Sequence, residues 1–431
     1  MHTKLFPQQE LAAQQLAALG RGALIAPTRS GKTLTLVRAC EIVNADAIMV
    51  VCPKIAVPLW QDVLAVELPG ALGLVVNYEG LLAKGFQEKF ERFKEAAGGN
   101  TALICDESHR LKTPASKMRR ALLPRLKYFR HRFIATATPV SNAGKLDEIY
   151  SQYSLLGGRI TFLFPTARSW REHFGVWQHH PYPKLLATRY EDEMHALISE
   201  VTVTLPERFN VREPTKVPCV LPENIQEIHD AIAVHGIYEG LEETYAPNPL
   251  VRLLKCRQQL HCVERMQKLD TCLPDSTPVL VFCEFRQEVE EVAALLAACG
   301  RHVGVITGAT EDKHRVLQQV LDRCGVAVCI PSTISTAIEL KGFQLIVWYT
   351  RGFNYLTWSQ ACDRVKANPN AQVLYLEAEN TVDVDVSQVL EGDHAHLENL
   401  KNGVTGVRIS APVDAEVSTA CGGYTYQIKV G

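Results

Sequence analysis

The chain has 431 residues, with 45 Lys and Arg against 47 Asp and Glu, and 47% of the residues are hydrophobic. That length predicts two or three domains, and the composition excludes disordered, collagen-like and coiled-coil proteins. No apolar run is long enough to span a bilayer, and the N-terminus lacks the apolar segment of a signal peptide. Thirteen cysteines without CxxC pairs favour reduced thiols, so we expect a cytoplasmic protein. The formal net charge of −2, taken alone, disfavours a nucleic-acid partner.

Two stretches of the chain repeat a rhythm of short apolar strand, polar break and amphipathic helix. The strands expected in the first stretch are Ala23–Ile25, Ala47–Val51, Leu74–Asn77, Ala102–Cys105 and Phe133–Ala135. Those expected in the second are Val279–Phe282, Val303–Ile306, Val326–Ile330, Leu345–Trp348 and Val373–Leu376. Continuous apolar strands separated by helices predict parallel sheets covered on both faces, and therefore a two-lobed α/β protein.

The predicted boundaries are a first lobe at 1–145, a helical insertion and interlobe connection at 146–255, a second lobe at 256–403 and a tail at 404–431. Helical character in the insertion is expected at Asp147–Leu156, Glu191–Ser199 and Asn224–Glu243. The alternation of Val, Ile and Thr in the tail predicts an extra strand or hairpin.

A phosphate-binding loop is predicted at residues 26–33, which read APTRSGKT between the strand GALIA and the helix TLVRACEIV. Unpaired N–H groups of such a loop and the dipole of the following helix favour phosphate oxygens. Lys32 would place its charge at the β- and γ-phosphates, and the Thr33 hydroxyl would bind Mg²⁺. The remaining predicted nucleotide-binding residues of the loop are Thr28, Arg29, Ser30 and Gly31.

An acidic pair, Asp106 and Glu107, follows the apolar strand TALIC. Asp106 would hold the metal through water, and Glu107 would polarise the attacking water. Alone, the sequence DESH is equally typical of a helix start, where acidic side chains are favourable. Together with the phosphate loop, it predicts a site for nucleotide hydrolysis with ATP and Mg²⁺ as cofactors.

Further motifs occur in an order that resembles superfamily two helicases, most closely the Swi/Snf-like DNA translocases, over most of the chain. The matching segments are LFPQQ at 5–9, PKIAVPLW at 53–60, NYEGL at 77–81, ATATPV at 135–140, VLVFCEF at 279–285, ITG at 306–308, QACDR at 360–364 and AENTVD at 378–383. The resemblance implies two RecA-like P-loop NTPase lobes, with ATP between them and nucleic acid across their tops.

The resemblance also implies roles for individual residues. Gln9 corresponds to the adenine-recognising glutamine, and Arg364 would stabilise the γ-phosphate charge when the lobes close. Thr136, Thr138 and Gln360 would couple ATP hydrolysis to nucleic-acid contact. The implied nucleic-acid contacts are Lys54, Tyr78, Thr138, Thr307 and Ser332.

Three features of the sequence allow a second interpretation. The second arginine of the family's motif VI is replaced by Ala367, next to Lys366. This replacement argues against fast ATP turnover, unless Arg364 or Lys366 substitutes for the missing arginine. The Ser/Thr-rich segment at 332–337 lacks the paired glycines of motif V and is equally typical of a turn. Trp60 and Tyr78 are equally typical of a hydrophobic core.

Residues 108–132 contain nine basic side chains and no Asp or Glu. They are Arg110, Lys112, Lys117, Arg119, Arg120, Arg125, Lys127, Arg130 and Arg132. Such one-sided charge favours an anionic partner, although a solvated basic face is the alternative. From this stretch we predict DNA contacts at Lys112, Lys117, Arg119 and Arg120. Because the charges are segregated along the chain, the near-zero net charge does not exclude nucleic acid.

These observations predict an ATP- and Mg²⁺-dependent translocase or helicase that acts on double-stranded or branched DNA. We expect a compact monomer without a membrane partner, from a bacterial or phage-infected cytosol. One alternative is an RNA helicase with the same engine. The other is a hydrolysis-poor module that binds ATP and nucleic acid and regulates a partner, which Ala367 favours.

Overall fold

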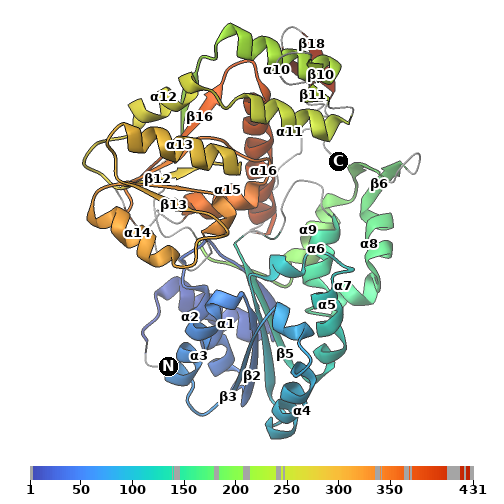
Figure 1. The fold of residues 1–431 in the computed structure, drawn as a ribbon. Helices are drawn as coiled ribbons and strands as arrows, with labels where there is room; N and C mark the ends of the chain where they lie inside the picture. Colours follow the sequence, from blue (N-terminus) through green and yellow to red (C-terminus); the bar gives the residue numbers. More distant parts are fainter. Residues whose placement is uncertain are drawn as a thin grey trace. The chain divides into compact units, whose positions relative to one another are not determined.

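The computed structural model describes residues 3–137, 139, 146–178, 184–206, 214–238, 244–245, 248–334, 340, 342–363, 368, 371–404, 418–421 and 424–427. The chain folds into two compact units, formed mainly by Met1–Arg208 and Phe209–His394. Each unit is built around a six-stranded sheet (Figure 1).

The first unit alternates strands and helices. Its elements are α1 (Pro7–Leu19), β1 (Arg21–Ile25), α2 (Lys32–Ile42), β2 (Ala47–Cys52), η1 (Lys54–Ala56), α3 (Val57–Glu67), β3 (Leu72–Asn77), η2 (Glu79–Leu82), α4 (Phe86–Ala96), β4 (Thr101–Asp106), η3 (Ser108–Leu111), α5 (Lys117–Leu122), η4 (Leu123–Tyr128), β5 (His131–Thr136), α6 (Leu146–Tyr153), α7 (Arg159–Leu163), α8 (Ala167–Phe174), β6 (Gly175–Gln178), β7 (Lys184–Thr188), α9 (Glu191–Ser199) and β8 (Thr202–Thr204).

The second unit repeats this alternation. Its elements are β9 (Thr215–Cys219), α10 (Glu223–His235), β10 (Ile237–Tyr238), β11 (Thr244–Tyr245), α11 (Pro249–Gln259), α12 (Val263–Cys272), β12 (Val279–Phe282), α13 (Arg286–Ala298), β13 (Val303–Ile306), α14 (Lys313–Asp322), β14 (Val326–Cys329), η5 (Pro331–Thr333), β15 (Leu345–Trp348), α15 (Tyr355–Asp363), β16 (Gln372–Ala378) and α16 (Val382–Val404). A hairpin of β17 (Ser418–Cys421) and β18 (Tyr424–Gln427) lies in the tail, where a strand or hairpin was expected.

Both sheets are parallel throughout. The strand order is β3-β2-β4-β5-β1-β8 in the first sheet and β13-β14-β12-β15-β16-β9 in the second. All ten strands predicted from the sequence are present, so the predicted fold of two RecA-like α/β lobes is confirmed. In Figure 1, helices α1, α2 and α3 lie on one side of the first sheet, and α4 and α5 lie on the other.

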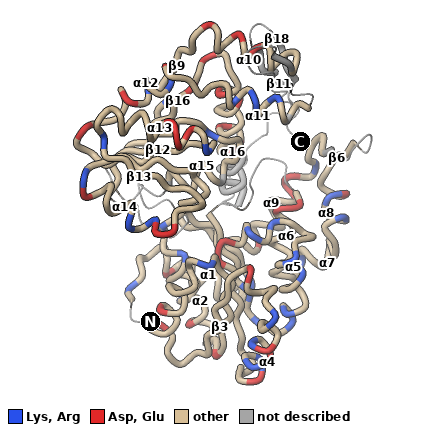
Figure 2. The backbone as a smooth tube through the Cα atoms, viewed as in Figure 1, with Lys and Arg blue, Asp and Glu red and all other residues tan. Residues whose placement is uncertain are grey.

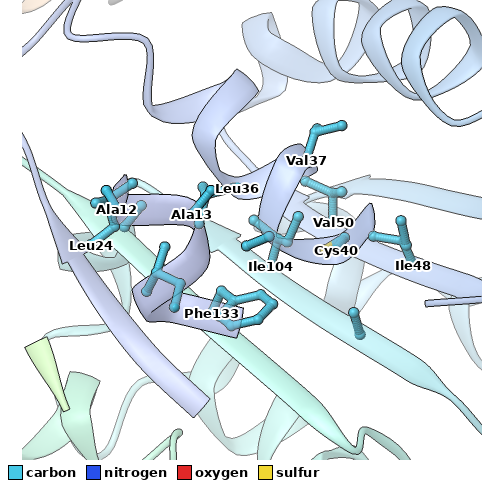
Figure 3. Packing of buried hydrophobic residues seen from close by; sticks show 14 of the residues in the cluster. Ala12, Ala13, Leu24, Leu36, Val37, Cys40, Ile48, Val50, Ile104 and Phe133 are labelled. Carbon is cyan, nitrogen blue, oxygen red and sulfur yellow. The ribbon is translucent and has the colours of Figure 1, made fainter. Parts of the chain in front are cut away.

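Burial on both faces explains why the strands are continuous apolar runs. In β12, Val279 and Val281 belong to one core cluster, whereas Leu280 and Phe282 belong to another. Successive side chains of a strand point to opposite faces, so each face of the second sheet carries its own core. Figure 3 shows the equivalent packing in the first unit, where residues of α1 and α2 meet those of the central strands.

The segment at 146–255 differs from the insertion that the sequence predicted. It contains helices, but it also supplies an edge strand to each sheet, because β8 pairs with β1 and β9 pairs with β16. Helix α10 is also shorter than expected, since Gly236 adopts a left-handed conformation with φ of 70° and ends it. The segment is therefore built into both units rather than set apart from them.

Across the described ranges, no helix has both the length and the hydropathy that crossing a bilayer requires.

Candidate functional site

The strands of the first sheet bring the predicted motifs to one edge. The phosphate loop follows β1, the acidic pair stands at the end of β4, and Thr136 ends β5. In the sheet register Ile25 faces Thr136, and Asp106 faces Ala135. Ligands of parallel α/β sheets bind outside the carboxyl ends of the strands, so this edge is the candidate site.

The phosphate loop holds Lys32 at the start of α2. Its Nζ donates to the carbonyl oxygens of Ala26 at 3.2 Å and Pro27 at 3.3 Å, and it lies 3.9 Å from Oε1 of Glu107. Gly31 has a φ of 84°, a left-handed conformation that favours glycine. The structure therefore brings the predicted cation of the loop beside the predicted general base.

Unpaired polar atoms in the loop fit a bound anion. Oγ of Ser30 and Nη1 of Arg29 are buried and make no hydrogen bond to any described residue. Buried polar groups are nearly always paired, so these two atoms are available to bind phosphate oxygens. Nearby, the half-buried Thr33 and the buried Asp106 offer hydroxyl and carboxylate oxygens, which Mg²⁺ prefers. The donor set of this unit thus fits a Mg²⁺–nucleotide.

The pKa values of the two carboxylates in the acidic pair are shifted in opposite directions. Burial, and then the charge of Glu107, raise the pKa of Asp106, while a hydrogen bond from Trp60 and the charge of Lys32 oppose that rise. Burial would also raise the pKa of Glu107, but Lys32 and then His109 outweigh it and lower the value. Glu107 therefore stays ionised, as a group that orients and deprotonates water requires.

His109 connects the acidic pair to the end of β5. Its Nδ1 lies 3.3 Å from Oε2 of Glu107 and 3.1 Å from Oγ1 of Thr136. Thr136 is buried, so this contact is shielded from solvent. His109 thus links Thr136 to Glu107, the predicted general base, and the coupling role of Thr136 stays a prediction.

Gln9 rests on the backbone of the phosphate loop. Its Nε2 donates to the carbonyl oxygen of Ser30 at 2.8 Å, and its Oε1 accepts from the N–H of Phe6 at 2.9 Å. A Cβ atom at Gly31 would lie 2.1 Å from Nε2 of Gln9, so the side chain closely covers the loop. The structure joins the glutamine to the loop, while adenine recognition stays a prediction.

Two aromatic residues are not nucleic-acid contacts but supports of Asp106. Trp60 and Tyr78 are fully buried. Nε1 of Trp60 donates to Oδ2 of Asp106 at 2.9 Å, and the Tyr78 hydroxyl donates to the Asp106 carbonyl oxygen at 2.6 Å. This corrects the assignment of Tyr78 to nucleic-acid binding, because a fully buried ring cannot reach a partner. The aromatic residue type indicated core packing, but nothing in the sequence indicated the bonds to Asp106.

Figure 2 marks the Lys and Arg positions along the backbone, and their burial separates the basic stretch into structural and exposed residues. Arg119 is buried, and its guanidinium donates to the carbonyl oxygens of Ser151 and Pro114 and to Oγ of Ser154. The expectation that Arg119 contacts DNA is therefore wrong, since its donors are used inside the unit.

The remaining predicted DNA contacts of the first unit reach solvent. Lys112 is half-buried and lies 3.4 Å from Glu148, so that acid partly offsets its charge. Lys117, Arg120 and Lys54 are exposed. These three cations are the accessible remainder of the predicted surface.

The second unit brings together fewer of the predicted residues. Thr307 accepts a hydrogen bond from the N–H of Ala309, and Ser332 is exposed in the short helix η5. The neighbouring Thr333 donates to the carbonyl oxygen of Ile330, which agrees with the alternative of a Ser/Thr-rich turn. Gln360 lies on α15, and its Nε2 is buried without a hydrogen bond to the described residues. The predictions for Thr138, Arg364, Lys366 and Ala367 lie outside the described residues.

A family model described as the SNF2-related domain matches residues 74–290, about half of the chain. The solved Sulfolobus solfataricus SWI2/SNF2 ATPase core in complex with dsDNA is similar, with 15% identity and a TM-score of 0.41 over 94% of each chain. The Sulfolobus solfataricus SWI2/SNF2 ATPase core domain has 16% identity and a TM-score of 0.39, over 93% of this chain and 90% of that one. No curated protein sequence matches the chain significantly.

Proposed function

The chain belongs to the SNF2-related domain family, and from that premise we propose that it is an ATP- and Mg²⁺-dependent motor that moves along double-stranded or branched DNA. The observation that carries the proposal is the placement of Lys32 Nζ 3.9 Å from Glu107, beside Asp106, at the carboxyl edge of one sheet. A cation for phosphates, a base for water and a carboxylate for metal are the groups that phosphoryl transfer to water needs.

Each of these residues has a distinct task. Lys32 would exchange its carbonyl partners for the β- and γ-phosphates, whose charge it offsets. Ionised Glu107 would orient the attacking water and accept its proton. Thr33 and Asp106 would hold Mg²⁺, which neutralises charge on the phosphates when bound.

The accessible cations on α5 support DNA as the track. Lys117 and Arg120 are exposed, and residues 108–132 contain no acid to offset them. Contacts from Lys and Arg to phosphates supply sequence-independent affinity, which falls as salt concentration rises. A motor that must release and re-grip its track needs this kind of contact.

The proposal is tested by ATP turnover without nucleic acid and with duplex DNA, branched DNA, single-stranded DNA or RNA. We expect stimulation by duplex or branched DNA and a loss of about 10²–10⁴-fold in the Lys32→Ala and Glu107→Gln variants. Lys89→Ala and Glu95→Gln, which alter exposed residues of α4, are the matched controls and should turn over ATP as the natural chain does.

The other outcomes separate the alternatives. Stimulation by RNA alone would indicate an RNA helicase. ATP binding without turnover on any polymer would contradict the motor and favour the regulatory module that Ala367 suggests. In the same assay, the Lys117→Ala/Arg120→Ala double variant should need several-fold more duplex DNA for half-maximal stimulation, and the difference should shrink as salt rises. An unchanged DNA requirement would remove α5 from the proposed surface.

A further inference from the structure

Helix α6 carries an unusual set of buried polar groups. Ser151 and Gln152 are almost fully buried, and Ser154, one residue beyond the helix, is also buried. Burying polar groups is unfavourable unless each finds a hydrogen-bond partner. The partners of these three residues lie on segments that the proposed function assigns to ATP and to DNA.

Gln152 connects α6 to both segments that leave the ATP edge of the sheet. Its Oε1 accepts from Oγ of Ser108 at 2.8 Å, and Ser108 is fully buried directly after Glu107. Its Nε2 donates to the carbonyl oxygen of Pro139, shortly after the end of β5, and to that of Glu148 at 3.0 Å. One amide thus contacts the chain that follows the general base and the chain that follows Thr136.

The opposite connection of α6 runs to the basic helix α5. Nε of Arg119 donates to the carbonyl oxygen of Ser151 at 3.0 Å, and its Nη2 donates to Oγ of Ser154 at 2.7 Å. Arg119 lies between Lys117 and Arg120, which are exposed on the same short helix. A buried guanidinium cannot leave its acceptors cheaply, so a displacement of α5 carries α6 with it.

We propose that α6 is the relay that couples the basic helix α5 to the acidic pair, with Gln152 and Arg119 as its positioning residues. The inference rests on the proposed function. Force on Lys117 or Arg120 passes through Arg119 to the backbone of α6 and through Gln152 to Ser108, the neighbour of Glu107. Close-packed interiors transmit such shifts because no free volume absorbs them.

The test compares two substitutions on α6. Gln152→Leu keeps the approximate volume but removes the bonds to Ser108 and Pro139. Tyr153→Phe is the matched control, since Tyr153 is equally buried and its hydroxyl lies 3.0 Å from Oγ1 of Thr202, a contact that leads to β8 instead. The readout is the ratio of ATP turnover with saturating duplex DNA to turnover without DNA.

We expect Gln152→Leu to lower this ratio about fivefold or more, and Tyr153→Phe to leave it within about twofold. Ser108→Ala, a smaller change that deletes the same bond, should lower the ratio in the same direction and serves if Gln152→Leu does not fold. If duplex DNA stimulates the natural chain, equal ratios in the three variants and the natural chain would overturn the relay.

A second readout separates failure of the relay from failure of the proposed function. Amide hydrogen exchange of α5 is measured with and without Mg²⁺–nucleotide. The relay requires nucleotide to change exchange in α5 of the natural chain and of Tyr153→Phe, but not of Gln152→Leu. If exchange follows that pattern but DNA does not stimulate ATP turnover, the relay is supported and the DNA motor is contradicted. If nucleotide does not change amide exchange in α5 of the natural chain, the relay is overturned, whether or not DNA stimulates ATP turnover.

Discussion

At the level of single residues, the carboxylate of Asp106 is defined by the groups that donate to it. Trp60 donates to Oδ2 at 2.9 Å, and the N–H of Glu107 donates to Oδ1 at 3.1 Å. Both bonds favour the ionised form, against the burial that raises the pKa of this group. The ionised form of this buried carboxylate, which is the proposed Mg²⁺ ligand, therefore depends on a donor 46 residues away in the chain.

The Trp60→Phe substitution tests this dependence. It removes the indole N–H and leaves a buried carboxylate oxygen short of a donor, so ionisation and metal binding become harder. We expect the Mg²⁺ concentration for half-maximal binding of a fluorescent ATP analogue to rise by about three- to tenfold. Nucleotide binding in the presence of EDTA should change little.

Trp170→Phe is the matched control. Trp170 is as fully buried as Trp60, but its Nε1 has no hydrogen-bond partner among the described residues. Its substitution should reduce stability through the lost volume and leave the Mg²⁺ requirement unchanged. Equal Mg²⁺ shifts in the two variants would show that packing, and not the bond, matters.

At the level of elements, helix α13 begins with a buried carboxylate. Oε2 of Glu288 accepts from the N–H groups of Glu284 and Phe285, each at 3.1 Å, and from the Thr350 hydroxyl at 2.5 Å. Burial nevertheless raises the pKa of Glu288 to about 7, because it outweighs the opposing hydrogen bonds from Thr350 and Phe285. The N-terminus of this helix is therefore sensitive to pH.

The sign of that sensitivity follows from proton linkage. The folded state keeps a proton on Glu288 up to pH of about 7, whereas an unfolded glutamate releases it near pH of about 4.3. The free energy of unfolding therefore falls as pH rises between those values. Glu288→Gln keeps an acceptor and cannot ionise, so the stability of the natural chain relative to this variant should fall by about 1–3 kcal/mol from pH 5 to pH 8.

Urea unfolding followed by circular dichroism at pH 5, 6, 7 and 8 measures this difference. Glu290→Gln, which changes an exposed carboxylate of the same helix, should show no such trend. A pH profile that is identical in the natural chain and Glu288→Gln would contradict the prediction.

At the level of the whole molecule, each unit encloses its own core around its own sheet. Units with separate cores unfold as separate cooperative steps. The phosphate loop and its acidic pair belong to the first unit alone. A nucleotide that binds there stabilises that unit by mass action.

We therefore expect two thermal transitions, of which Mg²⁺–nucleotide raises one. At about 100 times the dissociation constant, the ligand adds about 2.7 kcal/mol to the unit that binds it. Phe133→Leu, in the first core, should lower the transition that nucleotide raises, and Phe282→Leu, in the second core, should lower the other. Differential scanning calorimetry measures both. A single transition lowered by both substitutions would contradict independent units.

The fold was largely predictable because its signals are local. Ten apolar strands and the strand–loop–helix around Lys32 are read from neighbouring residues, and the structure contains them. The edge strands β8 and β9 were missed because they are short and half-polar, with sequences TVT and TKVPC that carry no strong periodicity. They are strands because a sheet edge is available to pair with them.

The amino-acid sequence by itself determined the fold class, the phosphate loop and the acidic pair, because each depends on adjacent residues and on the period of a strand or helix. Only the tertiary structure decided which side chains are accessible and what they contact. Tyr78 and Arg119 are buried and support the interior of the first unit. Gln152 accepts a hydrogen bond from Ser108, which lies 44 residues away in the chain. Burial and pairing of this kind arise when distant segments pack together and each buried polar group must find a partner.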